Sequence, residues 1–310
     1  MSARVPLWHR LTMLVASSLM LYLFSMRVMR EVSKSEPTVD QARLQRVKAT
    51  FKLPSSRSWT PLHEQVLATV LLPGETRVRL DDVAGLEDTK RLLRQLVVHC
   101  ESSAARRLNG VILHGPPGTG KTMLAKAVAT ELRRPFLTLS PSDLEDKYFG
   151  ESGKRVRAFF EVAHALAPCV VFMDELDGIC GTRCALDQSH VNTLKTMLLT
   201  SMDGVDTAAL PIMYMGATNR LDSVDAAMKR RMRLHIDVPL PDADVRRQML
   251  AKALPRESLT DAVLQRTKGL SGSDLDQLVA LAEFEASSHS GTVRTDDVDR
   301  AITRLKPSSP

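Results

Sequence analysis

The chain has 310 residues, of which 44% are hydrophobic and 4% aromatic, and its net charge is +6. This length and apolar content allow about two domains with a substantial core, while so few aromatic side chains exclude an extensive base-stacking surface for nucleic acid. Residues 1–80 hold 12 Lys/Arg and 5 Asp/Glu, a balance of +7, and residues 81–310 hold 30 and 31, a balance of −1. The near-neutral main part argues against a nucleic-acid partner, whereas the basic N-terminal segment is typical of a protein that lies beside a membrane.

Residues 11–26 form an uncharged, mostly apolar run between Arg10 and Arg27. As a helix the run would span about 24 Å at 1.5 Å per residue, against about 30 Å for the hydrocarbon core of a bilayer. Apolar residues before the run and snorkelling of the two arginines can make up the difference. We therefore predict that residues 1–30 are a membrane anchor with one transmembrane helix at about 11–26. Lys and Arg residues just after the run favour the cytosol for the residues that follow.

The same N-terminal segment also fits a mitochondrial targeting sequence. Four arginines and no acidic residue precede Glu31, and this composition is typical of such sequences. In that case the segment would be cleaved, and the rest of the chain would lie inside the mitochondrion. Both possibilities stay open at the level of sequence.

The remaining chain divides into a linker, an α/β part and a helical part. Residues 31–80 are predicted to be a linker with short helices at about 40–52 and 61–72. Short apolar runs then alternate with helical segments, at 111–113, 136–139, 169–173, 212–215 and 234–238. Such runs indicate a buried parallel sheet, and hence an α/β fold. After Pro239 the pattern is only helical, at about 242–253, 259–267, 273–286 and 295–305.

Residues 115–122, GPPGTGKT, follow the first apolar run and precede a helical run. This strand–loop–helix setting is that of a phosphate-binding loop. Its glycines let backbone N–H groups approach phosphate oxygens, and the helix N-terminus favours the same anion. Lys121 is expected to reach the β- and γ-phosphates of ATP, and Thr122 to bind Mg²⁺. The predicted nucleotide contacts of this loop are Gly115, Pro116, Pro117, Gly118, Thr119, Gly120, Lys121, Thr122 and Met123.

Two carboxylates follow the third apolar run, at the strand end where ligands bind in parallel sheets. Asp174 is expected to orient Mg²⁺, and Glu175 to act as the general base that activates water. The fourth run leads to Asn219, a neutral polar group suited to hold that water or the γ-phosphate. The three side chains therefore predict hydrolysis of the bound nucleotide.

Arg230 and Arg231 begin a basic cluster, completed by Arg233, before the last predicted strand. An arginine supplied by a neighbouring subunit can neutralise transition-state charge in phosphoryl transfer. Arg230 and Arg231 are both candidates for this role. A solvated basic helix end is the alternative interpretation.

Together, GPPGTGKT, VVFMDELD, GATNR, the arginines before VPLPD, and SGSDL resemble the motifs of the AAA family of ATPases, from Val78 to about Lys306. This resemblance implies a ring, usually a homo-hexamer, that binds ATP at the interfaces between subunits. It implies a large P-loop AAA subdomain with a parallel sheet at 81–239 and a small α-helical lid at 240–310. It also implies that Gly272 and Ser273 of the lid contact the nucleotide. Since relatives often carry a further basic residue where this chain has Leu234 or His235, the resemblance makes Arg231 the first candidate for the arginine and Arg230 the second.

Within this family, the chain resembles the membrane-anchored translocases of the outer mitochondrial membrane, which extract mislocalised tail-anchored proteins. The resemblance lies in the N-terminal apolar run, in residues 62–86, and in DKYFGES at 146–152. It implies a pore loop of Lys147, Tyr148 and Phe149, whose aromatic side chains grip an extended polypeptide by apolar contact. The expected function is ATP-driven extraction of membrane proteins by a single-pass protein whose motor faces the cytosol. For Phe149, packing beneath the following helix is the alternative.

Other functions stay open. The anchor would also suit a peroxisomal membrane, and a cleaved targeting sequence would place an assembly or remodelling factor at the inner mitochondrial membrane or in the matrix. Relatives that sever microtubules or disassemble filaments share the motor motifs. A nucleotide-binding subunit without hydrolysis is the non-enzymatic alternative, because relatives often carry a further basic residue where this chain has Leu234 or His235.

Overall fold

The computed structural model describes residues 40–53, 59–101, 110–144, 151–180, 188–203, 211–289 and 291–305. The predicted anchor at 1–30 and the predicted pore loop, Lys147 to Phe149, lie outside these ranges. Within the described ranges, no helix combines the length and the apolar character that a membrane crossing requires. The chain divides into two units, Met1–Ala42 and Arg43–Pro310. Apart from the first two residues of helix α2 (Gln41–Thr50), the described helices and strands all belong to the second unit.

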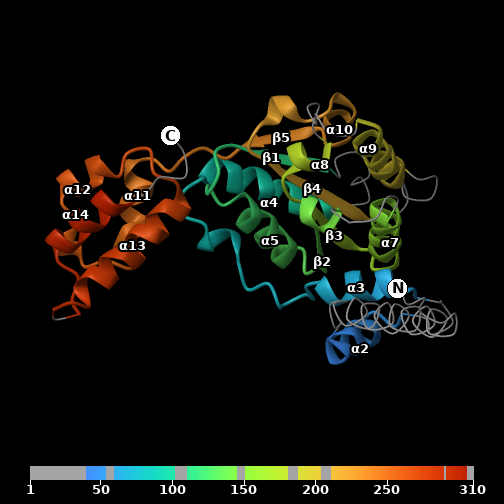
Figure 1. The fold of residues 1–310 in the computed structure, drawn as a ribbon, viewed down its shortest axis with the longest axis horizontal. Helices are drawn as coiled ribbons and strands as arrows, with labels where there is room; N and C mark the ends of the chain where they lie inside the picture. Colours follow the sequence, from blue (N-terminus) through green and yellow to red (C-terminus); the bar gives the residue numbers. More distant parts are fainter. Residues whose placement is uncertain are drawn as a thin grey trace, which may run out of the picture. The chain divides into compact units, whose positions relative to one another are not determined.

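The centre of this second unit is a parallel sheet, with the strand order β2–β3–β4–β1–β5 among the described residues (Figure 1). The strands are β1 (Gly110–His114), β2 (Phe136–Leu139), β3 (Cys169–Met173), β4 (Ile212–Thr218) and β5 (Leu234–Asp237). The predicted α/β fold with a parallel sheet is confirmed. Because β3, β4 and β1 are neighbours, their carboxyl ends lie side by side at one edge of the sheet.

Helices cover both faces of the sheet. On one face, Val111 and Leu113 of β1 share a core cluster with α4 (Glu87–Glu101) and α5 (Lys121–Glu131). On the other face, the ring of Tyr214 in β4 lies 6.3 Å from that of Phe160 in α7 (Glu151–Ala165). The other described elements of this part are η1 (Leu80–Asp82), α6 (Pro141–Leu144), α8 (Leu176–Cys180), α9 (Gln188–Asp203), η4 (Leu221–Ser223) and α10 (Ala226–Arg231). Burial on both faces explains why β1, β3 and β4 are mainly apolar runs.

Helix α3 (Pro61–Thr69) and the segment after it pack against the α/β part. His63 is buried, its Nε2 lies 2.8 Å from Glu161 Oε2 of α7, and its Nδ1 accepts a hydrogen bond from the Thr60 N–H at 3.2 Å. Leu71 forms an antiparallel bridge with Phe136 of β2, with N···O distances of 3.0 and 2.9 Å. The second half of the predicted linker is therefore part of the packed structure.

Beyond β5, every described element is helical. The elements are α11 (Ala243–Ala251), η5 (Arg256–Ser258), α12 (Asp261–Arg266), α13 (Gly272–Ala286) and α14 (Thr295–Arg304). The side chains of Asp242, Thr260 and Ser271 accept hydrogen bonds from the first turns of α11, α12 and α13, and such N-caps stabilise helix starts. The apolar faces form a separate core cluster that includes Leu250, Leu264, Leu275, Leu278 and Val298. This helical part is called the lid below, and its boundary at 239/240 stays a prediction.

Candidate functional site

The phosphate-binding loop connects β1 to α5. Gly115, Gly118 and Gly120 have φ values of 146°, 72° and 90°, which residues with a side chain rarely adopt. A Cβ at Gly115 would lie 2.2 Å from the Val238 carbonyl oxygen, so a larger residue does not fit there. Helix α5 begins at Lys121, so the last two residues of the GPPGTGKT motif are also the first two of the helix. The loop is therefore curled at the N-terminus of a helix, where an anion is favoured.

Lys121 is the buried cation of this loop. It is 8% exposed, and its ammonium group donates hydrogen bonds to the carbonyl oxygens of Gly115 at 2.9 Å and Pro116 at 2.7 Å. Burial lowers the pKa of Lys121 below its ordinary value, although the carboxylates of Asp174 and Asp177 oppose this effect. A partly desolvated ammonium group gains from an anion such as a phosphate, which favours its charged form.

Thr122 and Asp174 bring two oxygen ligands together beside the loop. Thr122 Oγ1 donates a hydrogen bond to Asp174 Oδ2 at 3.3 Å, and Asp174 Oδ1 accepts one from the Glu175 N–H at 3.0 Å. The Asp174 N–H donates to the Leu139 carbonyl at 2.9 Å, which continues the pairing of β3 with β2 and fixes the residue at the sheet edge. Hydroxyl, carboxylate and phosphate oxygens are the ligands that Mg²⁺ prefers, so the residues fit this ion.

Glu175 and Asn219 reach the same cavity from the neighbouring strands β3 and β4. Both residues are exposed, and both line the cavity together with Asp174. Glu175 has a φ of 47°, an uncommon conformation for a residue with a side chain. Strained conformations of this kind occur preferentially at functional sites. An exposed carboxylate in this position can accept a proton from water.

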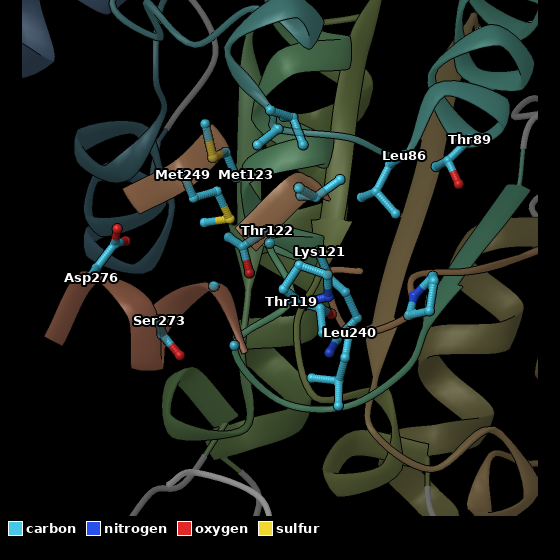
Figure 2. A pocket seen from close by; sticks show the side chains of 18 of the residues that line it. Leu86, Thr89, Thr119, Lys121, Thr122, Met123, Leu240, Met249, Ser273 and Asp276 are labelled. Atoms are coloured by element: carbon cyan, nitrogen blue, oxygen red, sulfur yellow. The ribbon is translucent and has the colours of Figure 1, made fainter. Parts of the chain in front are cut away.

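A cavity of about 1070 Å³ contains these side chains. Its walls come from the loop, from residues 82–84 and 86–89 and from the lid, and Figure 2 shows Lys121 between Leu86 and Ser273 of α13. The Ser273 N–H donates to the Gly118 carbonyl at 3.1 Å, and a Cβ at Gly118 would lie 2.0 Å from Ser273 Oγ. The lid therefore contacts the loop directly. A cavity of this size accommodates a nucleotide.

Comparison with known proteins identifies the family. The model of the ATPase family associated with various cellular activities (AAA) matches residues 111–240, which include the loop, both acids and Asn219. The chain belongs to the AAA family of ATPases. It is 34% identical to the spastin homolog of Caenorhabditis elegans over 274 residues, which cover 79% of this chain and 53% of that relative. The chain thus spans about half the length of this curated relative.

Solved AAA structures share the fold. The AAA domain of FIGL-1 in complex with ADP superimposes with a TM-score of 0.69 at 29% identity, covering 83% of this chain and 94% of that one. A structure described as the structural basis for katanin self-assembly gives a TM-score of 0.69 at 28% identity, with coverage of 83% and 94%. These likenesses extend well beyond the residues that the AAA family model matches.

The structure brings most of the predicted site residues of this AAA protein to one cavity. Those that line it are Pro117, Gly118, Thr119, Gly120, Lys121, Thr122, Met123, Asp174, Glu175, Asn219, Gly272 and Ser273. Gly115 and Pro116 are not among the lining residues, and their carbonyl oxygens instead hold the ammonium group of Lys121. In the structure, Gly115 and Pro116 therefore hold the Lys121 side chain in place.

Sequence reasoning missed the apolar part of the cavity wall. This part includes Val83, Ala84, Leu86, Leu240, Val245, Met249 and Val279. The wall is closely packed, since a Cβ at Gly85 would lie 2.4 Å from Val245 Cγ2 of α11. An apolar wall opposite a charged loop suits the base of a nucleotide. Apolar periodicity predicts that such residues are buried, but it carries no signal for which cavity they line.

Arg230 and Arg231 lie at the end of α10 and are not among the residues that line the cavity of their own chain. Arg230 is exposed, whereas Arg231 is half-buried and donates from Nη1 to the Ala227 carbonyl at 3.1 Å. Arg233 donates from Nε to the Arg230 carbonyl at 3.4 Å. This placement is compatible with a role at the nucleotide site of a neighbouring subunit.

Proposed function

We propose that this chain is a Mg²⁺-dependent ATPase that hydrolyses the terminal phosphoanhydride bond of ATP. The observation that carries the proposal is the convergence of Lys121, Asp174, Glu175 and Asn219 on one cavity, from the ends of β1, β3 and β4. A bound ATP with its Mg²⁺ would supply the electrophilic phosphorus and much of the charge neutralisation.

The position of each side chain sets its role in this reaction. Lys121 holds phosphate oxygens at the N-terminus of α5, and Thr122 and Asp174 would hold Mg²⁺. Glu175 takes the proton of the attacking water, and Asn219 orients that water from the neighbouring strand. Water activation and phosphate binding thus use different residues, which separate variants can address.

Replacing Lys121 with alanine tests the ATPase activity. Loss of a charged hydrogen-bond donor removes about 1.5–3 kcal/mol, so ATP binding should weaken by roughly 10- to 100-fold and phosphate release should fall with it. Phosphate release and the binding of a fluorescent ATP analogue measure the two effects. The exposed lysine Lys268 provides the matched control, Lys268→Ala, which should keep the wild-type values. A phosphate release that Lys121→Ala leaves unchanged would overturn the proposal.

We further propose that hydrolysis drives the extraction of mislocalised membrane proteins through the pore of a homo-hexamer. Support comes from the uncharged run at 11–26 and from the adjacent aromatic residues Tyr148 and Phe149 in a polar segment. The similarity to a katanin structure described as self-assembling supports the assembly. In this proposal the protein is anchored in the outer mitochondrial membrane with its motor in the cytosol, and the Tyr148 loop pulls the polypeptide.

Deleting residues 1–30 tests the membrane part of this proposal. The full chain should stay in the membrane pellet after alkaline carbonate treatment and co-localise with an outer mitochondrial membrane marker. The deletion variant should be released from membranes and keep its ATPase rate, because the nucleotide cavity lies elsewhere in the chain. Peroxisomal localisation would change the assigned membrane. A mature protein that begins after Arg30 would reveal a cleaved targeting sequence, and a full-length chain without membrane attachment would favour a severing or filament-disassembling role.

A further inference from the structure

Thr218 is a buried junction between three segments of the nucleotide site. It is the last residue of β4 and is 1% exposed. Its carbonyl accepts a hydrogen bond from the Gly115 N–H at 3.3 Å, its Oγ1 donates to Asp177 Oδ1 at 2.7 Å, and the same Oγ1 accepts from the Arg220 N–H at 3.0 Å. These bonds tie β4 to the start of the phosphate-binding loop, to α8, and to the turn that carries Asn219.

Asp177 connects this junction to Glu175. Asp177 lies in the first turn of α8, which begins directly after Glu175. Helix α8 packs closely on β4, since a Cβ at Gly216 would lie 2.2 Å from Leu176 Cδ1. The left-handed backbone of Glu175 persists only where the surrounding structure holds it. The hydrogen bond between Thr218 and Asp177 joins β4 to α8 within this packed region.

Neither Thr218 nor Asp177 lines the cavity, whereas their neighbours Asn219 and Glu175 do. Neither side chain touches a nucleotide bound in the cavity, although the Asp177 carboxylate also favours the charged form of Lys121. The hydrogen bond of the pair is short and has a charged acceptor, and such bonds are about twice as strong as those between neutral groups. This hydrogen bond can therefore hold the end of β3, which leads to Glu175, at a fixed distance from the end of β4, which leads to Asn219.

We propose that Thr218 and Asp177 are a positioning pair that fixes the distance between Glu175 and Asn219 around the attacking water. This inference rests on the proposed ATPase function. It assigns the hydrogen bond of this pair to the rate of the chemical step and leaves most of the nucleotide affinity to the loop and the lid. A displacement of reacting groups by about 1 Å can lower a rate by about 10²-fold.

Two substitutions at Thr218 separate the hydroxyl group from the shape of the side chain. Thr218→Val keeps the volume and removes the hydroxyl, and it should lower kcat by about 10- to 100-fold with KM changed by less than about threefold. Thr218→Ser keeps the hydroxyl and should retain kcat within about threefold. In kcat, Asp177→Ala should reproduce the loss of Thr218→Val, and the double variant should be no slower than the worse single one, because both remove the same hydrogen bond. KM is compared at Thr218 alone, because the Asp177 carboxylate also favours the charged form of Lys121.

ATP hydrolysis under steady-state conditions and binding of a fluorescent ADP analogue provide the readouts, and analogue binding shows that each variant is folded. Three results would overturn the positioning role: an unchanged kcat in Thr218→Val, a serine variant as slow as the valine variant, or additive losses in the double variant. A wild-type chain that does not hydrolyse ATP would instead overturn the proposed function. The two failures are therefore distinguishable.

Discussion

Replacing Glu175 with glutamine is expected to lower kcat for ATP hydrolysis by about 10²- to 10⁴-fold while ATP still binds. The Glu175 side chain is exposed in the cavity beside Asp174, and an amide of the same shape cannot accept the proton of the attacking water. Lys121 is expected to bind the phosphates, and Thr122 and Asp174 are expected to bind Mg²⁺. The Glu175 side chain takes part in neither interaction. The variant should therefore retain ATP rather than convert it.

Two measurements test this expectation together. Single-turnover phosphate release follows the chemistry, and retention of labelled ATP during gel filtration follows binding. Glu283→Gln is the matched control, because Glu283 is an exposed glutamate on α13 outside the cavity lining. Hydrolysis at the wild-type rate in Glu175→Gln would remove Glu175 as the general base. Loss of ATP retention would assign it a binding role instead.

The sheet and the loop were predictable because strong local constraints shape both. Strands β1, β3 and β4 are buried on both faces and therefore show as mainly apolar runs, and the loop motif needs its glycines at particular positions. Strand β4 departs from the prediction, since it continues to Thr218 instead of ending at Met215. The extra residues begin with Gly216, whose missing side chain makes room for Leu176. Because Gly216 adds no apolar side chain, it does not extend the apolar pattern from which the strand was predicted.

Contacts between distant segments were not predictable from the sequence. His63 bonds Glu161 across 98 positions, and nothing in its helix indicates a partner on α7. Ser273 meets Gly118 because the lid folds back onto the loop, whereas the family resemblance implied only a contact of Ser273 with the nucleotide. The pairing of Thr218 with Asp177 likewise depends on the packing of α8 against β4. Such pairs require the tertiary arrangement, which local patterns do not contain.

Replacing Arg231 with alanine is expected to lower ATP turnover by about 10³- to 10⁵-fold, the range found for arginines that act across a subunit interface. Arg231 lies at the end of α10 and outside the cavity lining of its own chain, so ATP binding by the single subunit should persist. The loss should appear only at concentrations at which subunits assemble. Arg230→Ala is the comparison, and a larger loss there would transfer the role to Arg230.

Mixing the Arg231→Ala and Glu175→Gln variants provides the sharper measurement, because each lacks a different group and is expected to be inactive alone. Where an Arg231→Ala subunit binds ATP and a Glu175→Gln neighbour supplies its arginine, the base and the arginine are both present, so activity should return. If the arginine acted on the nucleotide of its own chain, every site in the mixture would lack one group. Mixed assemblies that remain inactive would thus contradict a role in trans. Recovery would also demonstrate that the Arg231→Ala chain folds and binds ATP.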